Sequence, residues 1–163
     1  MILTPAQKAT IKADILANPD LNALPNNSDG NFALAMLYNV VASPDFIVWK
    51  TRVSKDEVML NGFDWARVDN LSVGKARIWD WMFDNLLKVI NPSKTNIRAG
   101  IDAAWVGTAA DLAVRAAIYV HCKRASSRIE KLLATGTGTT NDPATMGSEG
   151  PITPNDVESA RNS

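Results

Sequence analysis

Helix-start signals recur along this chain, and apolar residues at helical spacing follow each of them. Thr4 and Gln7 have the spacing of a capping box, in which each side chain bonds the backbone of the other residue at the start of a helix. Ile11 and Ile15 then fall on one face of the predicted helix over 5–18, because residues four apart are neighbours on a helix. A chain marked off in this way favours a set of short helices.

The same reasoning predicts more helices, over 31–42, 54–60, 72–88, 94–105 and 109–133. Ser72 and Thr108 are expected to cap the helices over 72–88 and 109–133. Within the range 31–42, Phe32, Met36 and Val40 recur every four residues, which predicts that their face is buried. The range 109–133 is the longest, and its many alanines favour helix and permit close approach of a neighbouring helix.

One segment and the end of the chain depart from the helical pattern. Residues 46–53 read FIVWKTRV, a β-branched and aromatic run that favours extended structure, although it could also begin a helix. Residues 135–163 are rich in Gly, Thr, Pro and Asn and contain few large apolar side chains. We therefore expect a mainly α fold: a compact bundle of about five helices with a long C-terminal-side helix, a possible short extended segment and a flexible C-terminal tail.

This pattern divides the chain into a helical domain over 1–134 and a flexible tail over 135–163 that orders on a partner. Thr153 and Asp156 have capping spacing, so the tail could form one short helical turn.

Charge and composition exclude some classes of function. Lys plus Arg and Asp plus Glu number 17 each, a balance that does not indicate broad binding to nucleic-acid phosphates. With Cys122 as the single cysteine, no intrachain disulfide can form. The first residues lack the pattern of a signal peptide, and no apolar run approaches the 18 or so residues of a membrane span. We therefore expect a cytoplasmic protein that does not enter a membrane.

The chemically reactive side chains do not form a recognisable catalytic group. His121 and Cys122 are adjacent on a predicted helix and point about 100° apart, so they fit packing roles better than a base and its nucleophile. Asp80 and Asp84 are four apart and could hold a cation, but a solvated helix surface is the better explanation for them. The run 136–138 lacks the Lys and Ser/Thr of a phosphate-binding loop. We expect no enzyme activity, no cofactor and no metal.

The tryptophans point instead toward protein contacts. Trp79 and Trp81 are two apart on a predicted helix, so one can enter the core while the other faces a second surface. Trp81 is therefore a candidate for partner binding, unless residues 63–65 fold back and cover it. The ranges 94–105 and 109 onward also look like a helix-turn-helix, but Asp111 near the start of the second helix would repel phosphate.

Three stretches are similar to stretches in proteins of tailed bacteriophages: NGFDWARVDNLSVGKARIWDWMFDN, INPSKTNIRAGIDAAW and GTAADLAVRAAIYVHCKRASSRIEKLLATGTGT. The resemblance extends from Leu3 to the tail. Among such proteins, the chain resembles the head–tail adaptor family, also called head completion or connector proteins. That family is small and helical, forms a twelve-fold ring under the portal, and commonly extends a C-terminal segment along it.

The resemblance implies a structural virion protein that is assembled in the host cytoplasm. Its partners would be a portal protein, a neck or tail protein and further copies in a twelve-fold ring, through which double-stranded DNA passes without sequence readout. The residues implied in partner binding are Arg124, Arg128 and Lys131, facing the portal or the lumen, and Met146, Ile152 and Val157, anchoring the tail. The alternatives are a tail-completion or capsid accessory protein, or a small helical nucleic-acid-binding regulator.

Overall fold

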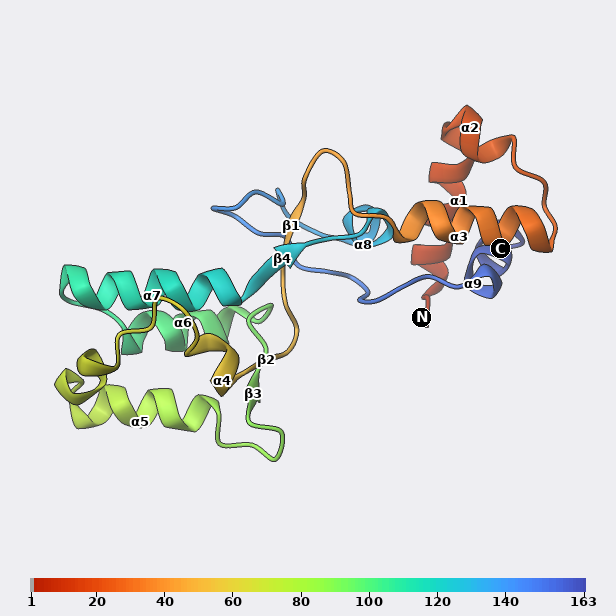
Figure 1. Ribbon diagram of the computed structural model, residues 1–163. Helices are drawn as coiled ribbons and strands as arrows, with labels where there is room; N and C mark the ends of the chain where they lie inside the picture. The colour runs from red at the N-terminus through yellow and green to blue at the C-terminus, as the bar shows by residue number, and fades with distance from the viewer. Residues whose placement is uncertain (1) are drawn as a thin grey trace. The chain divides into compact units, whose positions relative to one another are not determined.

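A computed structural model describes residues 2–163, and it is mainly α-helical, as expected. About 53% of the chain is helical, in ten helices among the described residues, with two small two-stranded sheets. The helices do not form the single bundle that the sequence predicted. They fall into two compact units: unit 1 contains the residues up to Val48 and Ala125–Ser163, and unit 2 is Trp49–Arg124. Figure 1 traces the chain through both.

Unit 1 joins the two ends of the chain around one core. Its helices are α1 (Pro5–Ala17), α2 (Pro19–Asn22), α3 (Ser28–Asn39), α8 (Arg128–Leu133) and α9 (Pro154–Arg161). The core consists of ten buried residues: Ile11, Ile15, Leu21, Leu34, Ala35, Tyr38, Ile129, Ile152, Val157 and Ala160. The capping box of Thr4 and Gln7 begins α1 as predicted, and Ile11 and Ile15 are buried on one face.

The segment predicted as a flexible tail is instead folded into unit 1. Ile152 and Val157 are only 2% and 0% exposed, because α9 packs against α1 and α3. The Asn39 side chain also accepts a hydrogen bond from Ile152 N and donates one to Ile152 O, both at 2.9 Å. The observed division therefore differs from the predicted boundary at residue 134. Composition alone missed this, since the few apolar residues of the segment complete a core built by distant parts of the chain.

The helix α3 buries a different face from the one predicted. Leu34, Ala35 and Tyr38 enter the core, whereas Phe32 and Met36 remain 59% and 57% exposed. Both faces carry apolar residues at helical spacing, so periodicity could not separate them. The packing of Tyr38 against α1, where its hydroxyl donates to Asp14 Oδ2 at 2.8 Å, selects the buried face.

The long helix predicted over 109–133 is also interrupted. It consists of α7 (Ala109–His121), β4 (Lys123–Ala125) and α8. The strand β4 pairs with β1 (Ile47–Trp49), which confirms extended structure within 46–53. Because that pairing joins segments far apart in sequence, local helix propensity did not reveal the break. The boundary between the two units falls within these two strands.

Unit 2 is built around an aromatic core. Its elements are β2 (Val53–Ser54), α4 (Lys55–Val58), the 3-10 helix η1 (Trp65–Asn70), α5 (Val73–Met82), β3 (Val89–Ile90), α6 (Thr95–Ala104) and α7. Strands β2 and β3 pair antiparallel, with Val53 opposite Ile90. The rings of Phe63, Trp79 and Trp105 meet at centroid distances of 5.5 to 6.2 Å. As predicted, Trp79 belongs to the core, and Ser72 and Thr108 cap α5 and α7.

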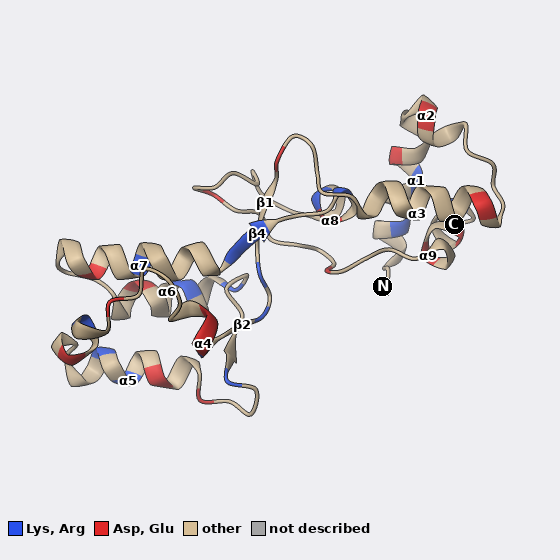
Figure 2. Cartoon of the chain, in the orientation of Figure 1, with Lys and Arg blue, Asp and Glu red and all other residues tan. Residues whose placement is uncertain are grey.

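Basic and acidic residues are interspersed over most elements, and β4 carries two adjacent basic residues, Lys123 and Arg124 (Figure 2). Among the described residues, no helix is long and apolar enough to cross a membrane.

Candidate protein-binding surfaces

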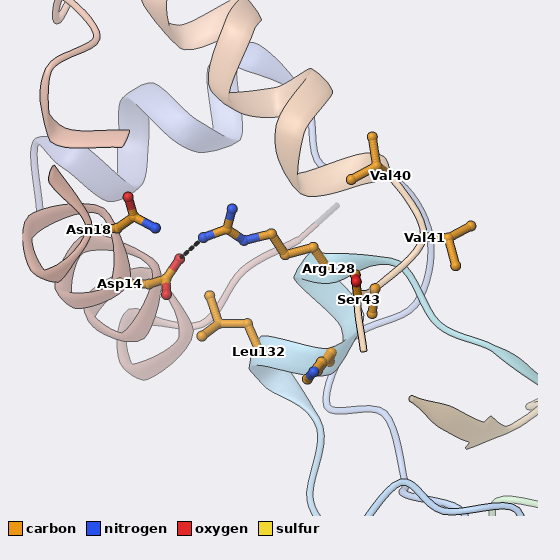
Figure 3. A pocket seen from close by; sticks show the side chains of 9 residues that line it. Asp14, Asn18, Val40, Val41, Ser43, Arg128 and Leu132 are labelled. Atoms are coloured by element: carbon orange, nitrogen blue, oxygen red, sulfur yellow. Dashed lines mark hydrogen bonds and ion pairs between the residues drawn. The ribbon is translucent and has the colours of Figure 1, made fainter. Parts of the chain in front are cut away.

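A pocket in unit 1 lies where α1, α8 and the segment after α3 meet. Its volume is about 670 Å³, and it is open to solvent. Figure 3 shows the lining side chains. They are Asp14, Asn18, Val40, Val41, Ala42, Ser43, Arg128, Lys131 and Leu132. The lining therefore combines apolar side chains, two cations and one carboxylate, a mixture that suits a polypeptide better than a purely apolar ligand.

Arg128 sits at the centre of a polar network in this pocket. Its Nη2 lies 3.3 Å from Asp14 Oδ2, and the guanidinium lies 5.3 Å from the centroid of the Tyr38 ring. The Tyr38 hydroxyl also donates to Asp14, so burial and this hydrogen bond raise the pKa of Tyr38 well above its ordinary value. The network holds Arg128 in place at the pocket, and its ion pair with Asp14 is partly exposed to solvent.

Lys131 provides the second cation of the pocket. It lies one helical turn after Arg128 on α8, as residues three apart do. Its Nζ donates to Pro44 O at 3.3 Å and lies 5.6 Å from the centroid of the Phe46 ring. A single exposed bond to a carbonyl leaves the ammonium able to pair with an incoming carboxylate.

The apolar side of the pocket has exposed side chains on a backbone that is held by hydrogen bonds. Val40 and Val41 are 54% and 65% exposed. The backbone beside them is tied to the start of α8, since Arg128 N donates to Val40 O at 2.8 Å and Ala42 N donates to Ser126 O at 2.9 Å. Phe32 and Met36 extend the exposed apolar surface along α3. Contiguous exposed apolar side chains of this kind commonly mark protein contacts.

The structure brings together only some of the residues predicted for partner binding. Arg128 and Lys131 line one pocket, whereas Arg124 lies in β4 within unit 2. Met146 is half-buried, and Ile152 and Val157 are core residues, so the last two cannot anchor a partner without unfolding unit 1. No local sequence signal pointed to Asp14, Asn18 and the segment 40–43, since only tertiary folding places them beside α8.

Trp81 marks a separate exposed surface in unit 2. It is 70% exposed, so residues 63–65 do not cover it; the Phe63 ring packs against Trp65, Trp79 and Trp105 instead. A pocket of about 320 Å³ lies beside it, lined by Trp81, Phe83, Lys55, Asp80, Asp84 and Lys88. Asp80 pairs with Lys55 at 3.3 Å and Asp84 pairs with Lys88 at 3.4 Å. An exposed tryptophan with paired charges around it is typical of a protein contact.

The reactive groups of the chain have structural surroundings. Burial raises the pKa of the Cys122 thiol to about 12, so it is protonated at neutral pH and a poor nucleophile. The Nε2 atom of His121 lies 3.2 Å from the backbone oxygen of Asn61, within hydrogen-bond distance. In the part of the chain that the structure describes, no three His, Cys, Asp or Glu residues come together as a metal site would require.

Comparison with protein-family models, curated proteins and solved structures found no match to this chain.

Proposed function

We propose that this chain is a structural protein of a tailed-phage particle, a head–tail adaptor that binds a portal protein on one side and a neck or tail protein on the other. The observation that carries the proposal is the open pocket of unit 1, where Arg128 and Lys131 lie beside the exposed Val40 and Val41. The sequence resemblance to phage proteins supports the choice of partner. Copies of the chain would form a ring that lets DNA pass.

The lining of the pocket defines the partner segment that it would accept. An acidic side chain or a C-terminal carboxylate would pair with Lys131 and compete with Asp14 for Arg128, while an apolar side chain would cover Val41. Pairing through Arg gives directional contacts, because its planar guanidinium can bond both oxygens of a carboxylate.

Docking through this pocket would differ from docking by an extended tail. The residues after Leu133 are folded into unit 1, so the binding surface exists before the partner arrives. Binding would then avoid most of the entropy cost of ordering a flexible segment. In a ring, several such contacts would act together and raise the overall affinity.

The proposal is tested by mixing the purified chain with the portal protein and examining the mixture by native mass spectrometry and negative-stain electron microscopy. A ring of copies bound to the portal is the expected result. Lys131→Glu and Val41→Asp should each weaken binding at least about tenfold, which corresponds to about 1.4 kcal/mol.

Lys8→Glu is the matched control, because it makes the same charge change on α1 away from the pocket. It should bind the portal like the wild-type chain. If both pocket variants also bind like the wild type, the pocket is not the docking site. If no ring forms on the portal and the chain binds a tail or capsid protein, it belongs to one of those assemblies.

A further inference from the structure

Two helices of the chain, one in each unit, present exposed apolar faces of equal length. Phe32 and Met36 on α3 and Val40 at its C-cap are 59%, 57% and 54% exposed and recur every four residues. On α7, Leu112 and Val120 are 41% and 69% exposed, with the exposed Ala116 midway between them. The ends of each face are eight residues apart, or about 12 Å at the helical rise of 1.5 Å per residue.

The two faces are complementary in shape. The α7 face borders a shallow groove of about 480 Å³, lined by Asp102, Leu112, Arg115, Ala116, Tyr119, Val120 and Lys123. Its middle is a small residue, Ala116, whereas the middle of the α3 face is the long Met36. Large side chains of one helix pack well into the gaps left by small residues of another.

The charges favour an antiparallel alignment of these faces. With Met36 opposite Ala116, Phe32 lies opposite Val120 and Val40 opposite Leu112. The same register places Asp29, in the first turn of α3, opposite Lys123, which follows the end of α7. Opposed charges then meet, and the two helix dipoles also run in opposite directions. A parallel alignment would place Asp29 near the start of α7, away from Lys123.

We propose that α3 of one copy of the chain packs antiparallel into the α7 groove of a second copy. The contact is heterologous, because the two faces differ, so each copy offers one α3 and one α7 to two different neighbours. Such a contact builds a closed ring or an open filament rather than a single pair. This inference rests on the proposed function in that it names the contact between copies in the ring.

A contact between two short helices is expected to be weak on its own. It would bury less than the roughly 1,200 Å² of a stable protein–protein interface, so the isolated chain should be mainly monomeric at micromolar concentration. Closure of a ring on a partner would strengthen it, since each copy is then held at two faces.

Cysteine crosslinking of the isolated chain tests the contact without any portal protein, so its failure is distinct from failure of portal binding. The variants Met36→Cys and Ala116→Cys are purified separately, mixed at high concentration and oxidised. The mixture should form a covalent dimer at least about tenfold faster than either variant alone. The buried Cys122 does not compete, because burial raises the pKa of its thiol to about 12.

Alignment is tested with Asp29→Cys, which should crosslink to Val120→Cys and not to Leu112→Cys. A matched control replaces Met36→Cys by Ala9→Cys, at an exposed position on α1, and should crosslink no faster than background. Three results would overturn the proposal: rapid dimerisation of Met36→Cys alone, no crosslink between the two variants, or an internal disulfide in monomers of the double variant. Preferential crosslinking of Asp29→Cys to Leu112→Cys would overturn the antiparallel register.

Discussion

Asp111 is a single residue on which the start of α7 depends. Its carboxylate accepts hydrogen bonds from Thr108 N at 3.0 Å and from Arg67 Nη2 at 2.8 Å, which joins η1 to the helix. The backbone N–H of Thr108 and then the Arg67 guanidinium lower the pKa of Asp111 to about 2. Asp111, whose position in the sequence indicated only a charge that would repel phosphate, thus has a structural role in unit 2.

The lowered pKa predicts how acid affects unit 2. An unfolded Asp has a pKa of about 3.9, so the folded state holds the charged form more strongly. The stability gained is therefore present above about pH 4 and is lost as the pH falls toward about 2. Asp111→Asn removes this titration, and its stability should fall less steeply than that of the wild type over that interval.

Urea unfolding midpoints measured at several pH values between 5 and 2 would compare the two chains. If the unfolding midpoint changed with pH in the same way for the wild type and for Asp111→Asn, Asp111 would have the same pKa in the folded and unfolded states.

Among the elements, α9 and the segment leading to it depart most from what composition indicates. The segment is polar overall, yet α9 contributes Val157 and Ala160 to the core of unit 1, and Ile152 precedes it. Arg161 fixes the far end of α9, since its Nη1 donates to Pro25 O at 2.8 Å and to Asn31 Oδ1 at 3.0 Å. The segment therefore serves as a structural part of unit 1.

Truncation of one core side chain tests that role. Ile152→Ala should lower the free energy of unfolding by about 2 to 5 kcal/mol, because it leaves a cavity in a packed core. The exposed Ser159→Ala on the same helix should change it by less than about 0.5 kcal/mol. Denaturant unfolding measures both values. Equal stability of Ile152→Ala and the wild type would instead agree with a flexible tail.

The sequence predicted elements well where local signals determine them. The caps at Thr4, Ser72 and Thr108 and the starts of three helices were correct because a cap is decided within a few residues. The break between α7 and α8 depends on pairing with β1, and a contact so distant in sequence leaves no local signal.

In the candidate site too, residues that are close in sequence could be predicted and residues brought together from distant segments could not. Arg128 and Lys131 were predicted because both lie on one predicted helix. The opposite wall of the pocket, which includes Asp14 and Val41, comes from segments about 90 to 114 residues earlier in the chain. The exposed face of α3 was misplaced, because two apolar faces compete on that helix and only tertiary packing selects between them.

At the scale of the molecule, the two units differ in how the chain builds them. Every core residue of unit 2 lies between Trp49 and Cys122, whereas the core of unit 1 needs residues from both ends of the chain. A unit with its own hydrophobic core can fold by itself.

This difference predicts the behaviour of fragments. Residues 49–124 alone should unfold cooperatively and keep the near-ultraviolet circular dichroism of a packed aromatic cluster. Residues 2–48 alone should be unfolded, since they lack Ile129, Ile152 and Val157. Circular dichroism during denaturation distinguishes the cases. A fragment over 49–124 without a cooperative transition would mean that unit 2 depends on unit 1.

The division of unit 1 into two sequence segments also sets an order during synthesis. The ribosome completes residues 49–124 before it makes α8 and α9, so unit 2 can fold while α1, α2 and α3 still lack most of their core partners. The exposed and unprotected apolar side chains of those first helices would then depend on chaperones until the last residues emerge. A nascent chain stalled before α9 should therefore be far more sensitive to protease in its first 48 residues than in the middle.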